Sequence, residues 1–307
     1  MKRKVCYSFT EMRAAAIFGP GASEKSLRPF QISETTWLTG IPVRASGVDA
    51  LLIFGGDGTV HRHLPDLVRL QLPVLVVPCG SGNDFARALG LSRVRDALAA
   101  WKKFATGGGN VRPIDLGVIT AIAEPAPRGH YFCCVGGVGL DAEVARRANR
   151  LPRWLRAHGG YVLSLAPSLF HLAPFPIKIS LPSTSSSDAF VPHGSQPTVL
   201  AAFANAPTYG GGMKIAPRAQ LDDGQLDLCI ISDIDPFKLF CLFPTIYFGK
   251  HLRMREVEYL QTSRVRIETE QPLDVYADGE YVCKTPIEAG VARGVLRVIV
   301  HPSQTSF

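Results

Sequence analysis

The residues most suited to chemistry form a Gly-Gly-Asp-Gly-Thr stretch at 55–59, directly after the apolar run at 48–54. Glycines let backbone amides approach a polyphosphate without a clash from a Cβ atom. The carboxylate of Asp57 can hold a metal ion or its water, and the hydroxyl of Thr59 can donate to a phosphate oxygen. The stretch therefore predicts a phosphate-binding loop, with an ordinary strand-to-helix turn as the alternative.

A second polar loop, at 78–87, reads Pro-Cys-Gly-Ser-Gly-Asn-Asp-Phe-Ala-Arg and follows the next apolar run. Its two glycines open the backbone, and Ser81 can bond a phosphate oxygen. Asn83 and Asp84 can cap a helix that begins at Phe85, as they could in any protein. Because the carboxyl ends of successive parallel strands meet at one edge of a sheet, the two loops predict one shared crevice.

The elements that must position these loops alternate between apolar runs and helical stretches. Apolar runs at 14–18, 48–54 and 72–77 each lead into a glycine-containing loop, which is typical of an open α/β sheet. From about residue 111 the pattern changes to short β-prone runs separated by Gly, Pro and Ser. The Ser- and Pro-rich stretch at 182–196 indicates a surface loop between two of these strands. The sequence therefore predicts an α/β domain followed by a mostly β domain.

Composition and charge narrow the class of protein. Of 307 residues, 46% are hydrophobic and 19% are charged, which favours a globular chain over a disordered one. The formal net charge of +7 favours an anionic partner. Seven cysteines without a C-x-x-C pair indicate reduced, buried thiols in a cytoplasmic protein. The most membrane-like stretch, at 161–177, is interrupted by prolines, so we expect no membrane span.

Six motifs follow one another along the chain, at 55–59, 78–87, 114–117 (Ile-Asp-Leu-Gly), 137–142 (Gly-Val-Gly-Leu-Asp-Ala), 210–227 and 278–280 (Asp-Gly-Glu). Their order resembles that of the diacylglycerol kinase catalytic-domain superfamily, which includes soluble bacterial diacylglycerol kinases and the sphingosine and ceramide kinases. The resemblance implies an α/β nucleotide-binding domain of the NAD-kinase and diacylglycerol-kinase type at 1–112. It also implies a C-terminal β-sandwich domain at 113–292, an active site in the cleft between the two, and a last strand, at about 293–307, that returns to the first domain.

The resemblance implies roles for individual residues in the reaction. The two glycine loops should contact the ATP phosphates, and Thr36, on an earlier strand, should touch the nucleotide. Glu280 matches the position of the family's general base, with Asp57 as the competing candidate and a solvent-exposed hairpin turn as the alternative. Phosphoryl transfer depends mainly on positioning and charge neutralisation, so we expect Glu280 to contribute rather than to dominate. The nucleotide-binding residues implied are Gly55, Gly56, Asp57, Gly58, Thr59, Ser81, Asn83 and Thr36.

The same resemblance implies Mg²⁺ at two places. One is a structural ion in the turn at 220–225, held by a carboxylate and main-chain oxygens, and the other is a metal near the phosphates that aspartates reach through water. Mg²⁺ suits both because it takes hard oxygen ligands and retains waters. The Asp-Asp-Gly at 222–224 predicts a β-turn with or without a metal. The residues implied are Gln220, Asp223 and Gln225 for the turn, and Asp57, Asp84 and Asp115 near the phosphates.

Two segments bear on the lipid acceptor. The first, at 144–187, contains no acidic residue and carries arginines around Trp154, and the second, at 238–255, combines Leu and Phe with basic residues. Such combinations suit an anionic bilayer surface. For each segment the alternative is a core helix with a solvated basic edge. The basic residues are Arg146, Arg147, Arg150, Arg153 and Arg156 in the first segment, and Lys238, Lys250, Arg253 and Arg255 in the second.

Two positions depart from the family pattern. Family members usually carry Asn-Pro after the first strand, where this chain has Gly19-Pro20. Many bacterial members carry Asn-Glu shortly after the first glycine loop, where this chain has His61-Arg62. The first departure bears on the adenine and ribose contacts, and the second on substrate preference.

These observations predict an ATP- and Mg²⁺-dependent lipid kinase that phosphorylates a membrane-lipid hydroxyl, with diacylglycerol, converted to phosphatidic acid, as the first choice. The alternative acceptor is a sphingoid base or ceramide, and the alternative of another class is a catalytically weak lipid-binding regulatory protein. NAD kinases and phosphofructokinases share the first glycine loop, but the segments at 83–87 and 210–227 favour the lipid branch. We expect a cytoplasmic protein peripherally associated with the membrane, anionic phospholipid as a partner and no nucleic acid, and a homodimer stays open.

Overall fold

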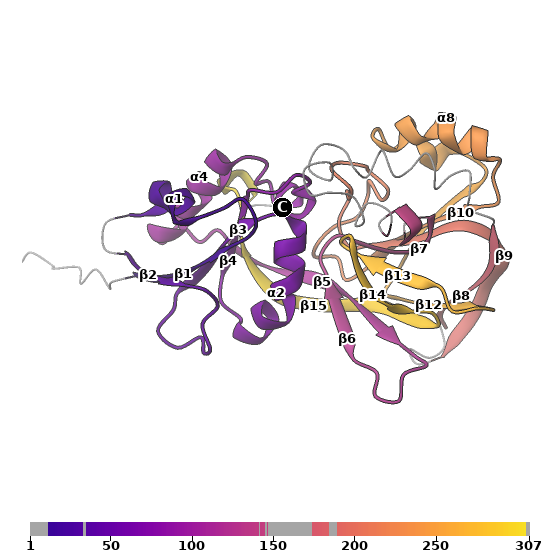
Figure 1. The fold of residues 1–307 in the computed structure, drawn as a ribbon, viewed down its shortest axis with the longest axis horizontal. Helices are drawn as coiled ribbons and strands as arrows, with labels where there is room; N and C mark the ends of the chain where they lie inside the picture. Colours follow the sequence, from indigo (N-terminus) through magenta and orange to yellow (C-terminus); the bar gives the residue numbers. More distant parts are fainter. Residues whose placement is uncertain are drawn as a thin grey trace, which may run out of the picture.

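The computed structural model describes residues 12–32, 35–140, 142–144, 146, 174–183 and 189–304. Within these residues, one mixed sheet of fifteen strands runs through two regions that lie side by side (Figure 1). The α/β region comes first in the chain and the mostly β region second, so the predicted fold class is confirmed. No helix of the described chain is both long and apolar enough to cross a bilayer.

The first region is a parallel sheet with helices packed on it. Strand β3 (Ala50–Gly55) is buried along its whole length, as expected for a strand covered on both faces. Helix α2 (Asp57–Leu70) buries Val60, Leu64 and Leu67 at helical spacing, and this apolar stripe packs it on the sheet. The other elements are β1 (Met12–Phe18), α1 (Glu24–Leu27), the 3₁₀ helix η1 (Arg28–Phe30), β2 (Thr35–Thr39), β4 (Val74–Pro78), α3 (Asp84–Ala88) and α4 (Val94–Ala105).

The predicted order of strand, glycine loop and helix is confirmed in this region. β3 is a parallel neighbour of both β1 and β4, so the carboxyl ends of the three strands lie at one edge of the sheet. α2 and α3 start in the loops that follow β3 and β4. Between β1 and β3 the chain forms α1, η1 and the edge strand β2, which pairs in parallel with β1.

The second region is built mainly from antiparallel strands around its own core. Phe132 and Phe203 are fully buried there, with ring centroids 5.7 Å apart in an edge-to-face arrangement. Helix α8 (Pro236–Ile246) lies on the outside of this region (Figure 1). The other elements are β5 (Val111–Ala121), β6 (Gly129–Phe132), β7 (Val135–Gly139), β8 (Phe175–Pro182), β9 (Phe190–Ala204), β10 (Leu226–Ser232), the 3₁₀ helix η2 (Lys250–Arg253), β11 (Val257–Thr262), β12 (Arg264–Thr269), β13 (Asp274–Ala277) and β14 (Glu280–Lys284).

Strand β15 (Ile287–Ile299) passes through both regions (Figure 1). Its first half pairs with β12 and β5, whereas in its second half Val298 lies opposite Val74 of β4, in parallel. The register with β5 shifts between the halves, near Gly294, whose φ of 61° favours glycine. The sheet follows the order β14-β13-β7-β9-β8-β12-β15-β4-β3-β1-β2, with β10, β11, β5 and β6 paired beside this path. β5 and β15 therefore tie the regions together, and a short 3₁₀ helix, η3 (Pro302–Gln304), follows.

The prediction of a surface loop at 182–196 is wrong for the second half of that stretch. β8 and β9 pair in antiparallel, with Gly194 opposite Ile179 and Phe190 opposite Pro182. Residues 190–196 are mostly exposed, so their polar side chains and prolines face solvent instead of interrupting a buried ladder. Composition alone indicates a surface segment here, and it does not separate an exposed strand from a loop.

The basic segment predicted at 144–187 lies largely outside the described residues. Arg146 is described, and it forms an ion pair with Glu143 at 2.5 Å. The residues of the prediction that lie outside the described part are Arg147, Arg150, Arg153, Trp154 and Arg156.

Candidate active site

The two glycine loops touch each other at the carboxyl ends of β3 and β4. A Cβ atom on Gly80 would lie 2.5 Å from the Cα atom of Gly56, and a Cβ atom on Gly56 would lie 2.9 Å from the Cα atom of Gly80. Both distances are shorter than side chains tolerate, so each position requires glycine because the two backbones are in contact. The structure thus joins the loops into one surface.

Asp57 links the two loops through hydrogen bonds. It is the first residue of α2, and its carboxylate accepts bonds from the amides of Asp84, at 3.1 Å, and Phe85, at 3.0 Å. Burial raises the pKa of Asp57 to about 6, the charge of Asp84 adds to this, and the two amides oppose it. Two carboxylates held this close favour a cation nearby, because it would neutralise both.

The capping role predicted for Asn83 and Asp84 is wrong. α3 begins at Asp84 rather than Phe85, and the amides at its start are bound by Asp57, which belongs to another helix. Asn83 has a φ of 55° and folds back on its own loop. Its Oδ1 accepts a bond from the Gly80 amide at 2.8 Å, and its Nδ2 donates to the Gly80 carbonyl at 2.6 Å. Asn83 therefore shapes the loop, and a tertiary contact caps the helix.

Asp84 connects the second loop to the second region. The side chain is buried, and its Oδ2 accepts a bond from the amide of Gly211 at 2.7 Å. Its Oδ1 accepts a bond from Arg87 at 2.6 Å. Gly211 belongs to a run of three glycines with positive φ, at 210–212, which opens the predicted 210–227 segment. This turn is therefore held at the glycine loops.

The remaining nucleotide-binding candidates lie in three different environments. Ser81 is exposed on the second loop. Thr59 is buried, and a Cβ atom would lie 2.3 Å from its Oγ1 if placed on Gly19 and 2.6 Å from it if placed on Gly55. Thr36 lies on the edge strand β2, opposite the start of β1, whereas the glycine loops follow strand ends. The structure thus brings Ser81 and Thr59 to the loops and does not bring Thr36 there.

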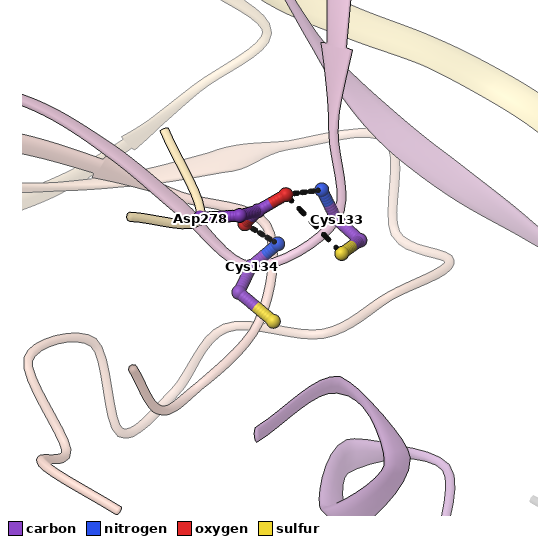
Figure 2. A group of neighbouring side chains, drawn as sticks. All are labelled: Cys133, Cys134 and Asp278. Carbon is purple, nitrogen blue, oxygen red and sulfur yellow. Dashed lines mark hydrogen bonds between the residues drawn. The ribbon is translucent and has the colours of Figure 1, made fainter. Parts of the chain in front are cut away.

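Asp278, in the turn between β13 and β14, is bound from several directions (Figure 2). Its carboxylate accepts bonds from the amides of Cys133 and Cys134, both at 2.8 Å, and from the Cys133 thiol at 3.2 Å. A further contact, at 3.0 Å, joins Oδ2 to Nδ1 of His61 on α2. Burial would raise the pKa of Asp278, but the His61 hydrogen bond and charge, with the backbone amides, lower it. Asp278 therefore anchors its turn both to the residues before β7 and to α2.

Cys133, Cys134 and Asp278 form a compact group whose ligand atoms lie within 4.8 Å of one another. A thiol must lose its proton to bind a metal. Burial raises the pKa of Cys133 to about 12, so this thiol stays protonated and donates to Asp278 instead. The group is better explained as a structural anchor for the turn than as a metal centre.

Glu280 follows Asp278 by two residues and faces the first glycine loop. A Cβ atom on Gly58 would lie 3.2 Å from Glu280 Oε1. The turn that presents it has positive φ at Asp278, 51°, and at Gly279, 84°. Glu280 is exposed, as the hairpin alternative requires, and it nevertheless lies against the first turn of α2. The structure therefore brings Glu280 to the loop that contains Asp57.

Comparison with known proteins identifies the family. Residues 36–119 match the diacylglycerol kinase catalytic domain, and residues 135–300 match the YegS C-terminal NAD kinase beta sandwich-like domain. A diacylglycerol kinase of Mycobacterium tuberculosis is 34% identical over 255 residues, which cover 83% of this chain and 78% of that protein. The chain belongs to the diacylglycerol kinase family of lipid kinases.

Further relatives agree with this assignment. A diacylglycerol kinase of Bacillus subtilis is 28% identical over 235 residues, which cover 76% of the lipid kinase described here and 71% of that protein. A solved structure of a diacylglycerol kinase from Bacillus anthracis shares the fold, with a TM-score of 0.65 at 20% identity, over 95% of this chain and 98% of that one. The predicted family, fold class and enzyme class are confirmed.

The turn at 220–225 of the lipid kinase presents oxygen atoms. Asp223 Oδ1 accepts a bond from the amide of Gln225 at 2.9 Å, and Oδ2 lies 3.4 Å from Gln261 Nε2. Gln220 is exposed and lines a cavity of about 240 Å³ with Arg112 and other residues of both regions. Asp223 thus keeps one carboxylate oxygen in only a long contact.

Asp115 holds this turn in place. The side chain is buried, its Oδ2 accepts a bond from the amide of Gly224 at 2.8 Å, and its Oδ1 accepts one from the amide of Gly294 at 2.7 Å. Its main-chain amide donates to the carbonyl of Leu221 at 2.6 Å. Asp115 therefore faces the 220–225 turn and the register shift of β15, and the structure does not turn its carboxylate to the glycine loops.

His61 and Asp278 form a pair that sequence reasoning missed. From sequence, His61 stands out only as a departure from the family pattern, and Asp278 only as part of a motif. One signal was available, because His61 lies four residues after Asp57, so both side chains lie on one face of α2. Its partner, 217 positions away, could not be found from local spacing.

Proposed function

We propose that the lipid kinase transfers the γ-phosphoryl group of ATP to the hydroxyl of diacylglycerol, giving phosphatidic acid at an anionic membrane surface. One observation carries the proposal: Glu280, from the second region, lies against Gly58 in the first glycine loop. A phosphate-binding loop and a carboxylate that can accept the proton of the acceptor hydroxyl are thereby adjacent, an arrangement that suits phosphoryl transfer to an alcohol.

The chain's own residues divide the work of the reaction. The amides around Gly56 and Gly80, with the exposed hydroxyl of Ser81, bind the phosphates at the start of α2, where the helix dipole favours negative charge. Glu280 accepts the proton of the attacking hydroxyl. Asp57 is the weaker candidate for this role, because both of its carboxylate oxygens already accept hydrogen bonds from backbone amides of α3.

The donor set also fits Mg²⁺. At the loops, Asp57 and Asp84 are like charges whose proximity contributes to the raised pKa of Asp57. At the turn, the Asp223 carboxylate and the main-chain oxygens of Gln220 and Gln225 are hard donors of the kind Mg²⁺ prefers. When bound near the phosphates, Mg²⁺ would neutralise charge that develops during transfer. We assign Asp115 the role of holding the turn, because its oxygens are used by two amides.

The surface formed by α8 and the residues up to 255 supports a membrane partner. Phe237 and Phe248 are 69% and 72% exposed, and the Lys250 ammonium lies 5.9 Å from the Phe248 ring centroid. Residues 236–255 include no acidic residue, but Glu256, which follows them, forms ion pairs with the predicted basic residues Lys238 and Arg255. Lys250 and Arg253 lie in the same segment. Burial and then the charge of Asp84 raise the pKa of Tyr247, so this end of α8 lies within electrostatic reach of the glycine loops. Exposed aromatic rings beside cations favour an anionic bilayer interface.

The experiment that tests the function is transfer of labelled γ-phosphate from ATP, with Mg²⁺, to a panel of lipids in mixed micelles. The panel contains diacylglycerol, sphingosine and ceramide, with NAD and fructose 6-phosphate as soluble controls. We expect label on diacylglycerol. Label on a sphingoid lipid alone would move the acceptor to the sphingosine and ceramide kinase branch, and no label on any lipid despite ATP binding would favour a regulatory protein.

A further inference from the structure

His61, in the second turn of α2, contacts the second region. Its Nδ1 lies 3.0 Å from Asp278 Oδ2, and its side chain is 17% exposed whereas that of Asp278 is fully buried. We infer that protonated His61 is a positioning residue that fixes the turn between β13 and β14, and with it Glu280, over the start of α2. This inference rests on the proposed role of Glu280 as the acceptor-side carboxylate.

The turn is well anchored on one side without His61. The Asp278 carboxylate accepts hydrogen bonds from the backbone amides of Cys133 and Cys134. The Asp278 backbone amide donates to the carbonyl of Val135 at 3.0 Å. These bonds join the turn to the second region only. The His61 contact joins it to α2, where Gly58 lies three residues earlier in the chain and faces Glu280. His61 therefore acts across the boundary at which Glu280 must be placed.

The charge of His61 matters because Asp278 is ionised in a buried place. A buried carboxylate without a cation is costly, and a buried carboxylate with a cation and several amides is stable. Burial would lower the pKa of His61, but the Asp278 hydrogen bond, the Asp278 charge and the Glu280 charge raise it. Three other ionisable groups surround the pair. The pKa values of the Cys133 and Cys134 thiols are raised, so both thiols stay neutral. The third group is Asp57, whose charge interacts with that of Asp278.

The sign of the pH effect follows from these shifts. The folded-state pKa of His61 is raised above its ordinary value of about 6.5, so the charged pair is fully present below that pH. The pair is lost as the pH rises through the folded-state pKa, and positioning of Glu280 weakens with it. A carboxylate that acts as a base loses activity on the acidic side instead. An alkaline loss of turnover therefore distinguishes His61 from Glu280.

The test measures kcat, and KM for ATP, from about pH 6 to about pH 9 in the diacylglycerol assay. His61→Asn keeps a side-chain donor but cannot be charged. We expect the wild-type kcat to fall as the pH rises through the alkaline range. The kcat of His61→Asn should be lower than that of the wild type at acidic pH and should not fall on the alkaline side. His61→Ala, which has no donor, should lower kcat by roughly tenfold to a hundredfold, with KM for ATP changed by less than about threefold.

A matched control lies on the same helix. His63 is partly exposed, and burial followed by Arg62 lowers its pKa, so His63→Asn should reproduce the wild-type pH profile. Titration of the His61 ring by NMR gives a second readout: the ring pKa should fall in Asp278→Asn. Identical pH profiles of wild type and His61→Asn, with Glu280→Gln still impaired, would overturn this inference alone. Full activity of Glu280→Gln would instead overturn the proposed role of Glu280.

Discussion

Two carboxylates, the half-buried Asp57 and the buried Asp84, lie beside each other where two helices begin. Their positions in polar loops after successive strands are visible in the sequence, so their convergence could be predicted. Their hydrogen-bond partners could not, because Asp57 binds amides of α3 and Asp84 binds Gly211 of the second region. Their place in the sequence predicted that Asn83 and Asp84 cap the helix that follows. In the structure, Asp57 of α2 caps α3 instead. At the residue scale, the sequence indicates which polar side chains lie together but not which groups they bind.

Asp57→Asn should abolish lipid phosphorylation while the protein stays folded. The ionised carboxylate, with a pKa of about 6, costs the fold about 3 kcal/mol at neutral pH because the charge is buried. The neutral asparagine side chain removes that cost. Its single oxygen can accept a hydrogen bond from only one of the two backbone amides of α3, and the unpaired amide costs roughly 2 to 3 kcal/mol. These effects offset, so the melting temperature should move by less than about 8 °C, whereas label transfer should fall by roughly a hundredfold or more. Near-normal transfer by the folded variant would place the phosphates elsewhere.

Strands and helices with a clear period were predictable, and exposed polar strands were not. The buried run of β3 and the apolar stripe of α2 give strong signals. The start of β9 does not, because its exposed Ser, Pro and Gly residues match the composition of a loop. α8 is an intermediate case. Its apolar sequence predicts a helix, and both alternatives, core helix and membrane surface, are open until the exposure of Phe237 and Phe248 is known.

The α8 surface predicts a specific effect on membrane binding. Phe237→Ser and Phe248→Ser should each weaken binding to vesicles that contain phosphatidylglycerol. Each ring removed loses about 1.5 to 3 kcal/mol of apolar burial, which corresponds to a loss of affinity of roughly tenfold to a hundredfold. Co-sedimentation measures the affinity. Zwitterionic vesicles should bind the wild type more weakly, since Lys250 and Arg253 then lack anionic partners.

The matched control for this surface is Val43→Ser. Val43 is 82% exposed, like the two phenylalanines, but lies in the first region between β2 and β3. Its substitution should leave vesicle binding unchanged. Equal binding by wild type, Phe237→Ser and Phe248→Ser would assign membrane contact to another part of the chain.

At the scale of the whole molecule, the site exists because two strands cross between the regions. β5 and β15 pair with each other along both regions, and β15 also meets β12 on one side and β4 on the other. This frame brings the β13–β14 turn to α2, so that residues 217 positions apart in sequence form an ion pair. The order of motifs indicated two domains and a shared site. The particular contacts of Glu280 and Asp278 depend on the docking of the regions, which no local pattern encodes.

The most direct test of this arrangement compares Glu280→Gln with wild type in transfer of γ-phosphate from ATP to diacylglycerol, with ATP affinity measured on the same preparation. Glutamine keeps the size of the side chain and cannot accept a proton as a carboxylate does. We predict a kcat lower by roughly a hundredfold to ten-thousandfold and an ATP Kd changed by less than about twofold. An unchanged kcat would contradict a site formed by the glycine loops of one region and the β13–β14 turn of the other.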